Sequence, residues 1–179
     1  EASNSRMAGG NLIKKVLFPA EILPIVAVLA NMMHFFFGLP ILVGFLVWFR
    51  PTITVTEILW FPIVVAVQLL FTLGLGLILA ALTVHFRDIK DILSNMLTLW
   101  FFATPILYPM HLAPGTISKA FLNANPFTHF AVSYQEILFY EGPFGHWKWI
   151  LAMAAGSALL FLVGYFLFDR LRDSFAEEV

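Results

Sequence analysis

The segment ILWFPIVVAVQLLFTLGLGLILAALTV, residues 58–84, contains no Asp, Glu, Lys or Arg. About 20 apolar residues in a helix cross the roughly 30 Å hydrocarbon core of a bilayer, so this run is long enough to span a membrane. The whole chain has the same character, since 60% of its 179 residues are hydrophobic and 12% are charged. An average soluble domain has about 25% charged residues. The composition therefore predicts a membrane protein.

Three more apolar runs are long enough to cross the membrane, so the predicted fold is an all-α polytopic membrane protein with four spans. The predicted spans cover residues 22–49, 58–84, 92–108 and 149–168. The third is the shortest. Every Asp, Glu, Lys and Arg lies outside these runs, as the cost of burying charge in lipid requires.

The distribution of basic residues predicts the orientation, because cytoplasmic flanks of spans are enriched in Lys and Arg. If four spans alternate, seven of the ten basic residues fall on one side: Arg6, Lys14, Lys15, Arg87, Lys90, Arg170 and Arg172. The other three fall on the opposite side: Arg50, Lys119 and Lys148. We therefore expect 1–21 to be a cytosolic segment, 169–179 a cytosolic tail and 109–148 an external loop, all within one transmembrane domain, 1–179.

The external loop contains the amphipathic segment NPFTHFAVSYQEILFYEGP, residues 125–143. Asn125 can cap a helix whose first residue is Pro126, and the Gly142-Pro143 pair can end it, which predicts a helix over about 127–141. This helix is short for a span. Two arrangements remain open from the residues alone. Together with ISKAFLNA, residues 117–124, it forms a hairpin that re-enters the outer leaflet, or it lies flat on the membrane surface.

Two charged segments lie on the predicted cytosolic side. NLIKKVLFPAEILP, residues 11–24, carries Lys14 and Lys15 on a short helix that is either a membrane-surface anchor or a lever. HFRDIKDIL, residues 85–93, places Asp88 as the cap of the next helix. This second segment is either a capped turn or a contact point for a cytosolic partner.

Small and aromatic residues raise two further questions. Thr72, Gly76 and Ala80 recur every four residues, a stripe that predicts close approach of another helix. The chain also has 20 Phe, 5 Trp and 4 Tyr. Most Phe side chains in membrane helices face lipid or fill the bundle, but some are expected to line a pathway if the cargo has sugar rings that stack on aromatic faces.

The chain lacks the sequence motifs of common enzymes. It has no G-x-x-x-x-G-K-[ST], H-E-x-x-H or G-x-S-x-G pattern, and no cysteine. Its net charge of −1 gives no basic field for nucleic acid. His34 is the one histidine within the predicted spans, and these contain no Asp, Glu, Lys or Arg. We therefore expect a transport subunit with no catalytic residue, metal or cofactor of its own, driven by a partner.

Five segments, taken in order, resemble a single family: NLIKKVLFPAEILP (11–24), LGLGLILAALTVHFRDIKDI (73–92), FFATPILYP (101–109), NPFTHFAVSYQEILFYEG (125–142) and FDRLRDSFAEEV (168–179). They resemble the permease subunit of ABC-2 type exporters, in the branch that exports O antigen, capsule or teichoic acid chains. Each motif alone is modest. Their order along nearly the whole chain makes the resemblance specific.

The resemblance implies a six-span permease that forms a homodimer in the bacterial inner membrane. Two copies of a cytosolic ATPase would bind it and carry the ATP and Mg²⁺. The four spans here would be the last four of six, preceded by an amphipathic helix and two spans. The cargo would be a lipid-linked glycan. Two alternatives stay open: an ABC-2 exporter of drugs or small lipids, and a non-transporting membrane scaffold for glycan assembly.

The family pattern also implies roles for individual residues. Coupling to the ATPase would involve Lys14, Lys15, Phe18, Arg87 and Asp88. The pathway or the external gate would involve Phe101, Phe102, Tyr108, Phe127, Phe130 and Tyr134, with re-entrant helices within 109–148 closing the gate. Many relatives have an arginine at the position of Gln135, so a role of that positive charge does not carry over to this chain.

Overall fold

The computed structural model describes residues 22–49, 55–85, 89–106, 108, 115–140 and 143–171, which form helices and short connections without a strand. The helices are α2 (Ile22–Phe49), α3 (Val55–His85), α4 (Ile89–Ala103), α5 (Gly115–Ala124), α6 (Pro126–Leu138) and α7 (Trp147–Leu171). Three of them, α2, α3 and α7, are long and apolar enough to cross a membrane. The prediction of an all-helical polytopic membrane protein is confirmed.

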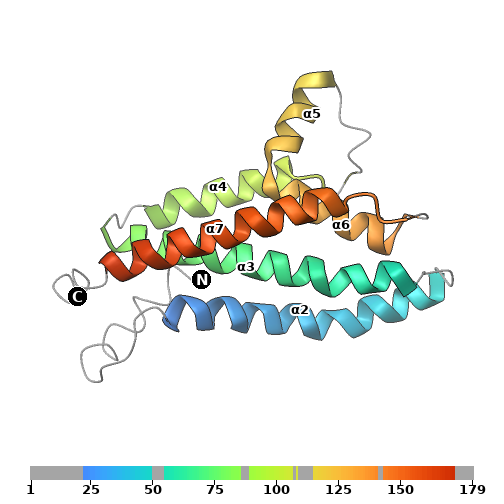
Figure 1. Cartoon of the computed structure of the whole chain (residues 1–179), viewed down its shortest axis with the longest axis horizontal. Coiled ribbons are helices and arrows are strands. Elements are labelled where there is room, and N and C mark those ends of the chain that lie inside the picture. The colour runs from blue at the N-terminus through green and yellow to red at the C-terminus, as the bar shows by residue number, and fades with distance from the viewer. Residues whose placement is uncertain are drawn as a thin grey trace.

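The long helices lie side by side, and α3 contacts both α2 and α7. Figure 1 shows the start of α2 and the end of α7 at one end of this bundle, with α6 towards the other end. The helix α4 runs beside the bundle, whereas α5 projects away from it. The two arms of the predicted hairpin thus differ, because α6 packs into the bundle and α5 does not.

The helix α4 is shorter than the third predicted span, 92–108. It ends at Ala103 because the ring of Pro105 disfavours helical backbone at the residue before it, Thr104. The hydroxyl and the N–H of Thr104 both donate to the Trp100 carbonyl, at 2.8 and 3.0 Å. At about 1.5 Å per residue its 15 residues reach only about 22 Å, less than the roughly 30 Å hydrocarbon core.

The other predicted spans differ little from the observed helices. The bounds of α2 coincide with 22–49, while α3 and α7 extend beyond 58–84 and 149–168 at both ends.

The pair α3 and α7 makes the most extensive helix contact. A Cβ atom on Gly74 would lie 2.7 Å from the backbone nitrogen of Phe161, and one on Gly164 would lie 2.6 Å from the carbonyl oxygen of Gly74. The two backbones therefore touch where neither helix has a side chain, as small residues allow in membrane helices. Leu77 and Phe168 are fully buried beside this crossing.

The predicted stripe of small residues lies only partly at this contact, where Ala80 is fully buried in one cluster with Leu77 and Phe168. Thr72 and Gly76 face a cavity on another side of α3, and Thr72 is exposed. Gly74, which lies between them in the sequence, makes the close contact with α7.

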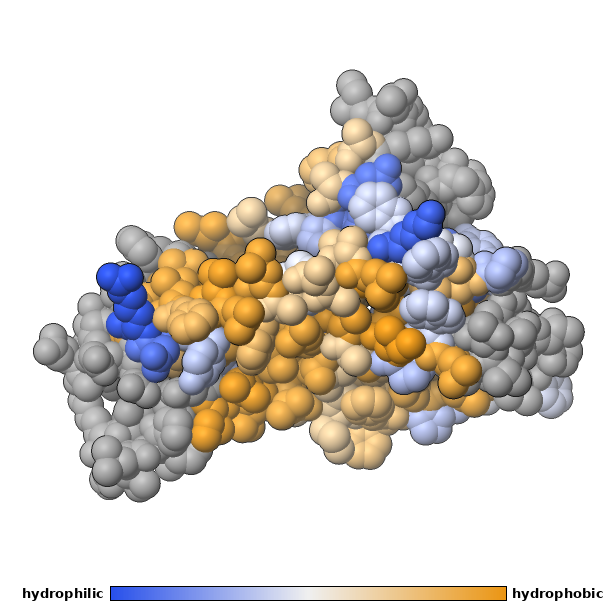
Figure 2. Space-filling view, viewed as in Figure 1, coloured by the Kyte–Doolittle hydropathy of each residue, from blue (hydrophilic) through white to orange (hydrophobic). Residues whose placement is uncertain are grey.

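A second core holds α6 between α3 and α7. Val64 and Val67 of α3, Phe130 and Ile137 of α6, and Ile150 of α7 are buried together there. On the face shown in Figure 2, the surface is mostly apolar along the bundle, with hydrophilic residues towards its ends and around α5 and α6. Large side chains such as Phe37 and Phe45 are 70% and 62% exposed, as expected where lipid rather than water surrounds a helix.

Candidate functional site

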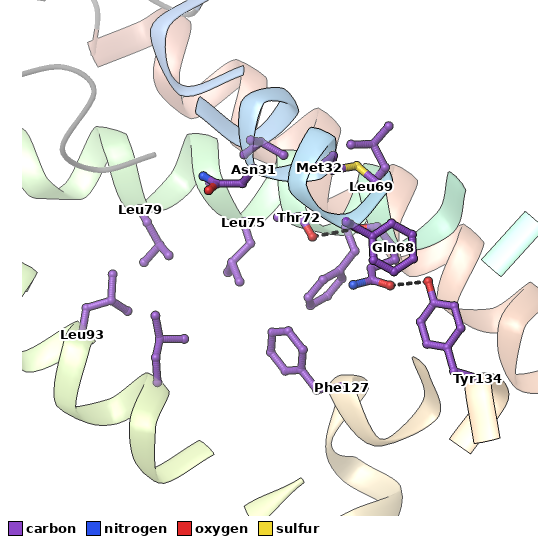
Figure 3. A pocket seen from close by; sticks show the side chains of 15 residues that line it. Asn31, Met32, Gln68, Leu69, Thr72, Leu75, Leu79, Leu93, Phe127 and Tyr134 are labelled. Atoms are coloured by element: carbon purple, nitrogen blue, oxygen red, sulfur yellow. Dashed lines mark hydrogen bonds between the residues drawn. The ribbon is translucent and has the colours of Figure 1, made fainter. Parts of the chain in front are cut away.

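A cavity of about 440 Å³ lies between α2, α3, α4 and α6 (Figure 3). Leucine, methionine, valine and phenylalanine side chains form most of its wall, and four polar side chains also line it: Asn31, Gln68, Thr72 and Tyr134. Such a surface suits an elongated apolar group or the face of a ring more than a charged one.

Each of the four polar side chains of the cavity makes a hydrogen bond within the protein. The Tyr134 hydroxyl donates a 2.5 Å hydrogen bond to Oε1 of Gln68, which joins α6 to α3 (Figure 3). Thr72 donates through its hydroxyl to the Gln68 carbonyl at 2.8 Å, and the Asn31 amide donates to the Ala27 carbonyl at 2.9 Å. Burial raises the pKa of Tyr134, so its hydroxyl stays protonated and remains a donor at neutral pH.

The start of α6 is held by Asn125, which caps the helix as predicted. Its Oδ1 accepts from the Phe127 N–H at 3.0 Å and from the indole Nε1 of Trp100 at 2.9 Å. Its Nδ2 donates to the Thr104 hydroxyl at 3.1 Å. One buried amide therefore caps α6 and ties it to the end of α4.

A second side chain of α6 uses the end of α4. The Gln135 amide donates to the Pro105 carbonyl at 2.7 Å, a backbone acceptor that lies beyond the last turn of α4. The helix α6 ends at Leu138, earlier than the predicted 141, and the N–H groups of Phe139 and Tyr140 both donate to the Gln135 carbonyl. Gln135 thus connects α6 to α4 through a neutral amide.

Aromatic rings pack against one another where α6 meets α3 and α4 beside the cavity. The Phe127 ring packs edge-on against both Phe71 and Trp100, with centroids 5.4 Å apart in each pair. Phe71 also contacts Phe130, with centroids 5.6 Å apart. The Tyr134 ring lies 5.7 Å from that of Phe61. These rings join α6 to α3 and α4.

The predicted pathway residues fall in different places. Phe127 and Tyr134 line the cavity, whereas Phe130 is buried in the core between α3, α6 and α7. Phe101 and Phe102 pack edge-on against each other on α4, 45% and 65% exposed, and neither lines the cavity. Tyr108 is half-buried and donates to the Ala103 carbonyl at 3.4 Å.

The predicted coupling residues Lys14, Lys15, Phe18, Arg87 and Asp88 lie outside the described residues. Within the described ranges, no group of three or more His, Cys, Asp or Glu side chains is placed to hold a metal ion.

Two features of the site carried only weak signals in the sequence. Gln68 stands out as a polar residue within an apolar span, which marks it for a partner but does not identify Tyr134, 66 residues away. Trp100 does not stand out in the sequence, because aromatic residues are abundant throughout this chain. Its indole donor finds Asn125 only once α4 and α6 meet.

Comparison of the sequence with known proteins identifies a family. The sequence model of a family described as "ABC-2 type transporter" matches residues 8–139. The chain is 40% identical over 172 residues to the "O-antigen export system permease protein RfbA" of Myxococcus xanthus, covering 94% of this chain and 65% of that relative. It is 30% identical over 173 residues to a protein of the same name from Klebsiella pneumoniae, covering 97% and 66%. The chain thus spans just under two thirds of the length of these relatives. In agreement with its sequence motifs, the chain belongs to the ABC-2 type transporter family.

Proposed function

We propose that this chain is the permease part of an ATP-driven exporter that moves a lipid-linked polysaccharide across the bacterial inner membrane. The observation that carries the proposal is the similarity along nearly the whole chain to relatives named as O-antigen export permeases. The cavity supports it, since its apolar and aromatic wall suits a substrate with a lipid part and stacked sugar rings.

In this proposal α5 and α6 form the external gate, re-entering the outer leaflet between the third and fourth spans. Phe127 and Tyr134 place two aromatic rings of α6 in the wall of the cavity, so a displacement of α6 would change the shape of that wall. The burial of Thr128, Phe130 and Ile137 fits a helix sheltered by protein rather than one lying on the membrane surface. Opening would require α6 to leave its hydrogen bonds to Gln68 and Pro105.

The energy would come from a cytosolic ATPase subunit that binds ATP and Mg²⁺, with the permease acting as a homodimer. Lys14, Lys15, Phe18, Arg87 and Asp88 would contact that subunit, with both ends of this chain in the cytoplasm. The absence of a phosphate-binding loop in the sequence fits this division of labour.

Co-purification with the ATPase tests the proposal. The full-length permease is extracted mildly from its native membrane, as the wild type and as Lys14→Glu/Lys15→Glu. The matched control, Lys119→Glu/Lys148→Glu, reverses two charges on the predicted external side. We expect an ATPase to co-purify with the wild type and the control, and to be lost or uncoupled from transport in the Lys14/Lys15 variant. Absence of any ATPase from the wild type would contradict the proposal and favour the scaffold function.

The cargo is tested with the same preparation in liposomes. We expect a lipid-linked oligosaccharide to stimulate ATP hydrolysis more than the same lipid without sugar. Equal stimulation by both would favour an exporter of small lipids.

A further inference from the structure

Three ionisable side chains form a continuous chain of contacts between α6 and the start of α7. Nδ1 of His129 lies 3.1 Å from Nε2 of His146, and Nδ1 of His146 lies 3.5 Å from Oε1 of Glu136. At the other end, Nε2 of His129 lies 2.9 Å from the Asn123 carbonyl of α5. The His129 side chain is almost completely buried.

The partners determine where the hydrogens lie. A carbonyl can only accept, so His129 carries a hydrogen on Nε2 and, when neutral, offers a lone pair at Nδ1. His146 must then donate from Nε2 to His129. Its Nδ1 faces an ionised carboxylate, which also only accepts. The contact between the two histidines is therefore satisfied only while His129 is neutral and Nδ1 offers its lone pair.

Further contacts fix this chain to the backbone around it. Oε2 of Glu136 accepts from the N–H groups of Gly145 and His146 at 3.1 and 3.0 Å. The ring of Trp149, in the first turn of α7, stacks on His129 with centroids 4.2 Å apart and an angle of 14° between the planes. The neighbouring cation on α7, Lys148, instead lies over the Trp147 ring, 5.5 Å from its centroid.

Protonation of His129 would break this arrangement. A second hydrogen on His129 at Nδ1 would point at the hydrogen on Nε2 of His146, so two donors would face each other across 3.1 Å with no acceptor between them. Because the His129 side chain is buried and stacked against Trp149, it cannot turn away without separating α6 from α7. Histidine is the side chain whose ordinary charge change falls near physiological pH.

We propose that Glu136, His146 and His129 form a pH-sensitive clasp that holds α6 against the start of α7 at neutral pH and releases it in acid. The clasp follows from the contacts alone. Its consequence for transport, an external gate that opens more readily when the outside is acidic, rests on the proposed function.

Distance measurement between two spin labels tests the clasp without measuring transport. This sequence contains no cysteine, so labels can be placed within it at exposed Phe139, next to α6, and exposed Leu162 on α7, after substitution by cysteine, in a full-length protein whose cysteines outside this sequence are replaced by serine. In lipid nanodiscs at about pH 8 we expect one distance population, and at about pH 5 a second, longer one.

Two variants with uncharged side chains test whether protonation of His129 causes the second, longer distance. His129→Gln cannot gain the second hydrogen, and in His146→Gln the amide can turn its oxygen towards a protonated His129. Each is expected to keep the single neutral-pH population at both pH values, so either one suffices if the other fails to fold. The matched control is His34→Gln, at an exposed position of α2, and it should keep the full change in distance between about pH 8 and about pH 5. An unchanged wild type, or an acid population that persists in a folded variant at position 129 or 146, would overturn the clasp whatever the export assays show.

Discussion

The hydroxyl of Tyr134 on α6 and the side-chain oxygen of Gln68 on α3 are joined by a hydrogen bond across the wall of the central cavity. This is the polar bond that directly connects the proposed gate helix to the longest helix of the described bundle. A polar bond in apolar surroundings contributes about 1 kcal/mol in membrane proteins, so its loss should be measurable but should not unfold the protein.

Tyr134→Phe is expected to lower the free energy of unfolding by about 1 kcal/mol, because it leaves Gln68 without this donor. Gln68→Leu should have a similar effect, and the double variant should lose less than the sum of the two. Equilibrium unfolding in mixed detergent measures all three. Tyr165→Phe, which removes a hydroxyl from a 42% exposed side chain on α7, is the control. Additive losses in the double variant would show that the two side chains are not coupled.

Gly74→Ala and Gly164→Ala should each destabilise the protein by about 1–3 kcal/mol, because the added methyl group meets backbone atoms that cannot move aside. Gly156→Ala provides a matched control on α7, since a Cβ atom there has nothing within 4 Å. Alanine favours a helix over glycine by about 1 kcal/mol, so the control should be neutral or stabilising. Equal melting temperatures for Gly164→Ala and Gly156→Ala would refute the close contact between the two backbones.

Asn125→Ala should destabilise the start of α6 by about 2 kcal/mol, since it removes the helix cap and the bonds to Trp100 and Thr104. Amide hydrogen exchange of residues 126–138 measures the effect, with faster exchange expected in the first turn. Asn125→Asp keeps the acceptor for Phe127 and Trp100 and loses only the donor to Thr104, so its effect should be smaller. A faster exchange rate confined to α5 would contradict the role assigned to Asn125.

The stability of the α6–α7 contact should fall as the pH drops. Burial lowers the pKa of His129 from its ordinary 6.5; the Asn123 carbonyl opposes this shift and the charge of His146 adds to it. Below about pH 6.5 the unfolded chain therefore binds more protons at this residue than the folded chain, which favours unfolding. For Glu136, burial raises the pKa, but the bonds from His146 and Gly145 outweigh it and hold the pKa below its ordinary 4.5.

The contribution of Glu136 is thus present above about pH 4.5 and is lost as the pH falls through its lowered value. Melting temperatures from about pH 8 to about pH 4 should decline in the wild type. Glu136→Gln should be less stable at neutral pH and should decline less below about pH 4.5. A parallel decline in both proteins would show that Glu136 is equally charged in the folded and unfolded states.

The spans could be predicted from the sequence because lipid excludes charge, so each helix appears as a run free of Asp, Glu, Lys and Arg. The cap of α6 could also be predicted, since Asn125 and Pro126 are local signals that need no tertiary structure. The early end of α4 was readable in principle from Pro105. The apolar run continues past this proline to Tyr108, so its length alone predicts a longer span.

The contacts between helices could not be predicted, because helical spacing shows which residues share a face but not which face meets which partner. Gly74 contacts Gly164, which lies 90 residues later in the sequence, and Gln68 accepts a hydrogen bond from Tyr134, which lies 66 residues later. His129 and His146 lie 17 residues apart, and no sequence pattern pairs them. Their importance depends on the turn that brings the start of α7 back onto α6.

The direct backbone contact of α3 with α7 has a mechanical consequence. Where two helices touch through Gly74 and Gly164, no side chain stands between them that could change rotamer and let one slide past the other. This pair is therefore expected to behave as a rigid frame during any working cycle. The moving parts would be the elements that meet that frame through side chains rather than backbone, so displacements should concentrate in α6 and in the end of α4.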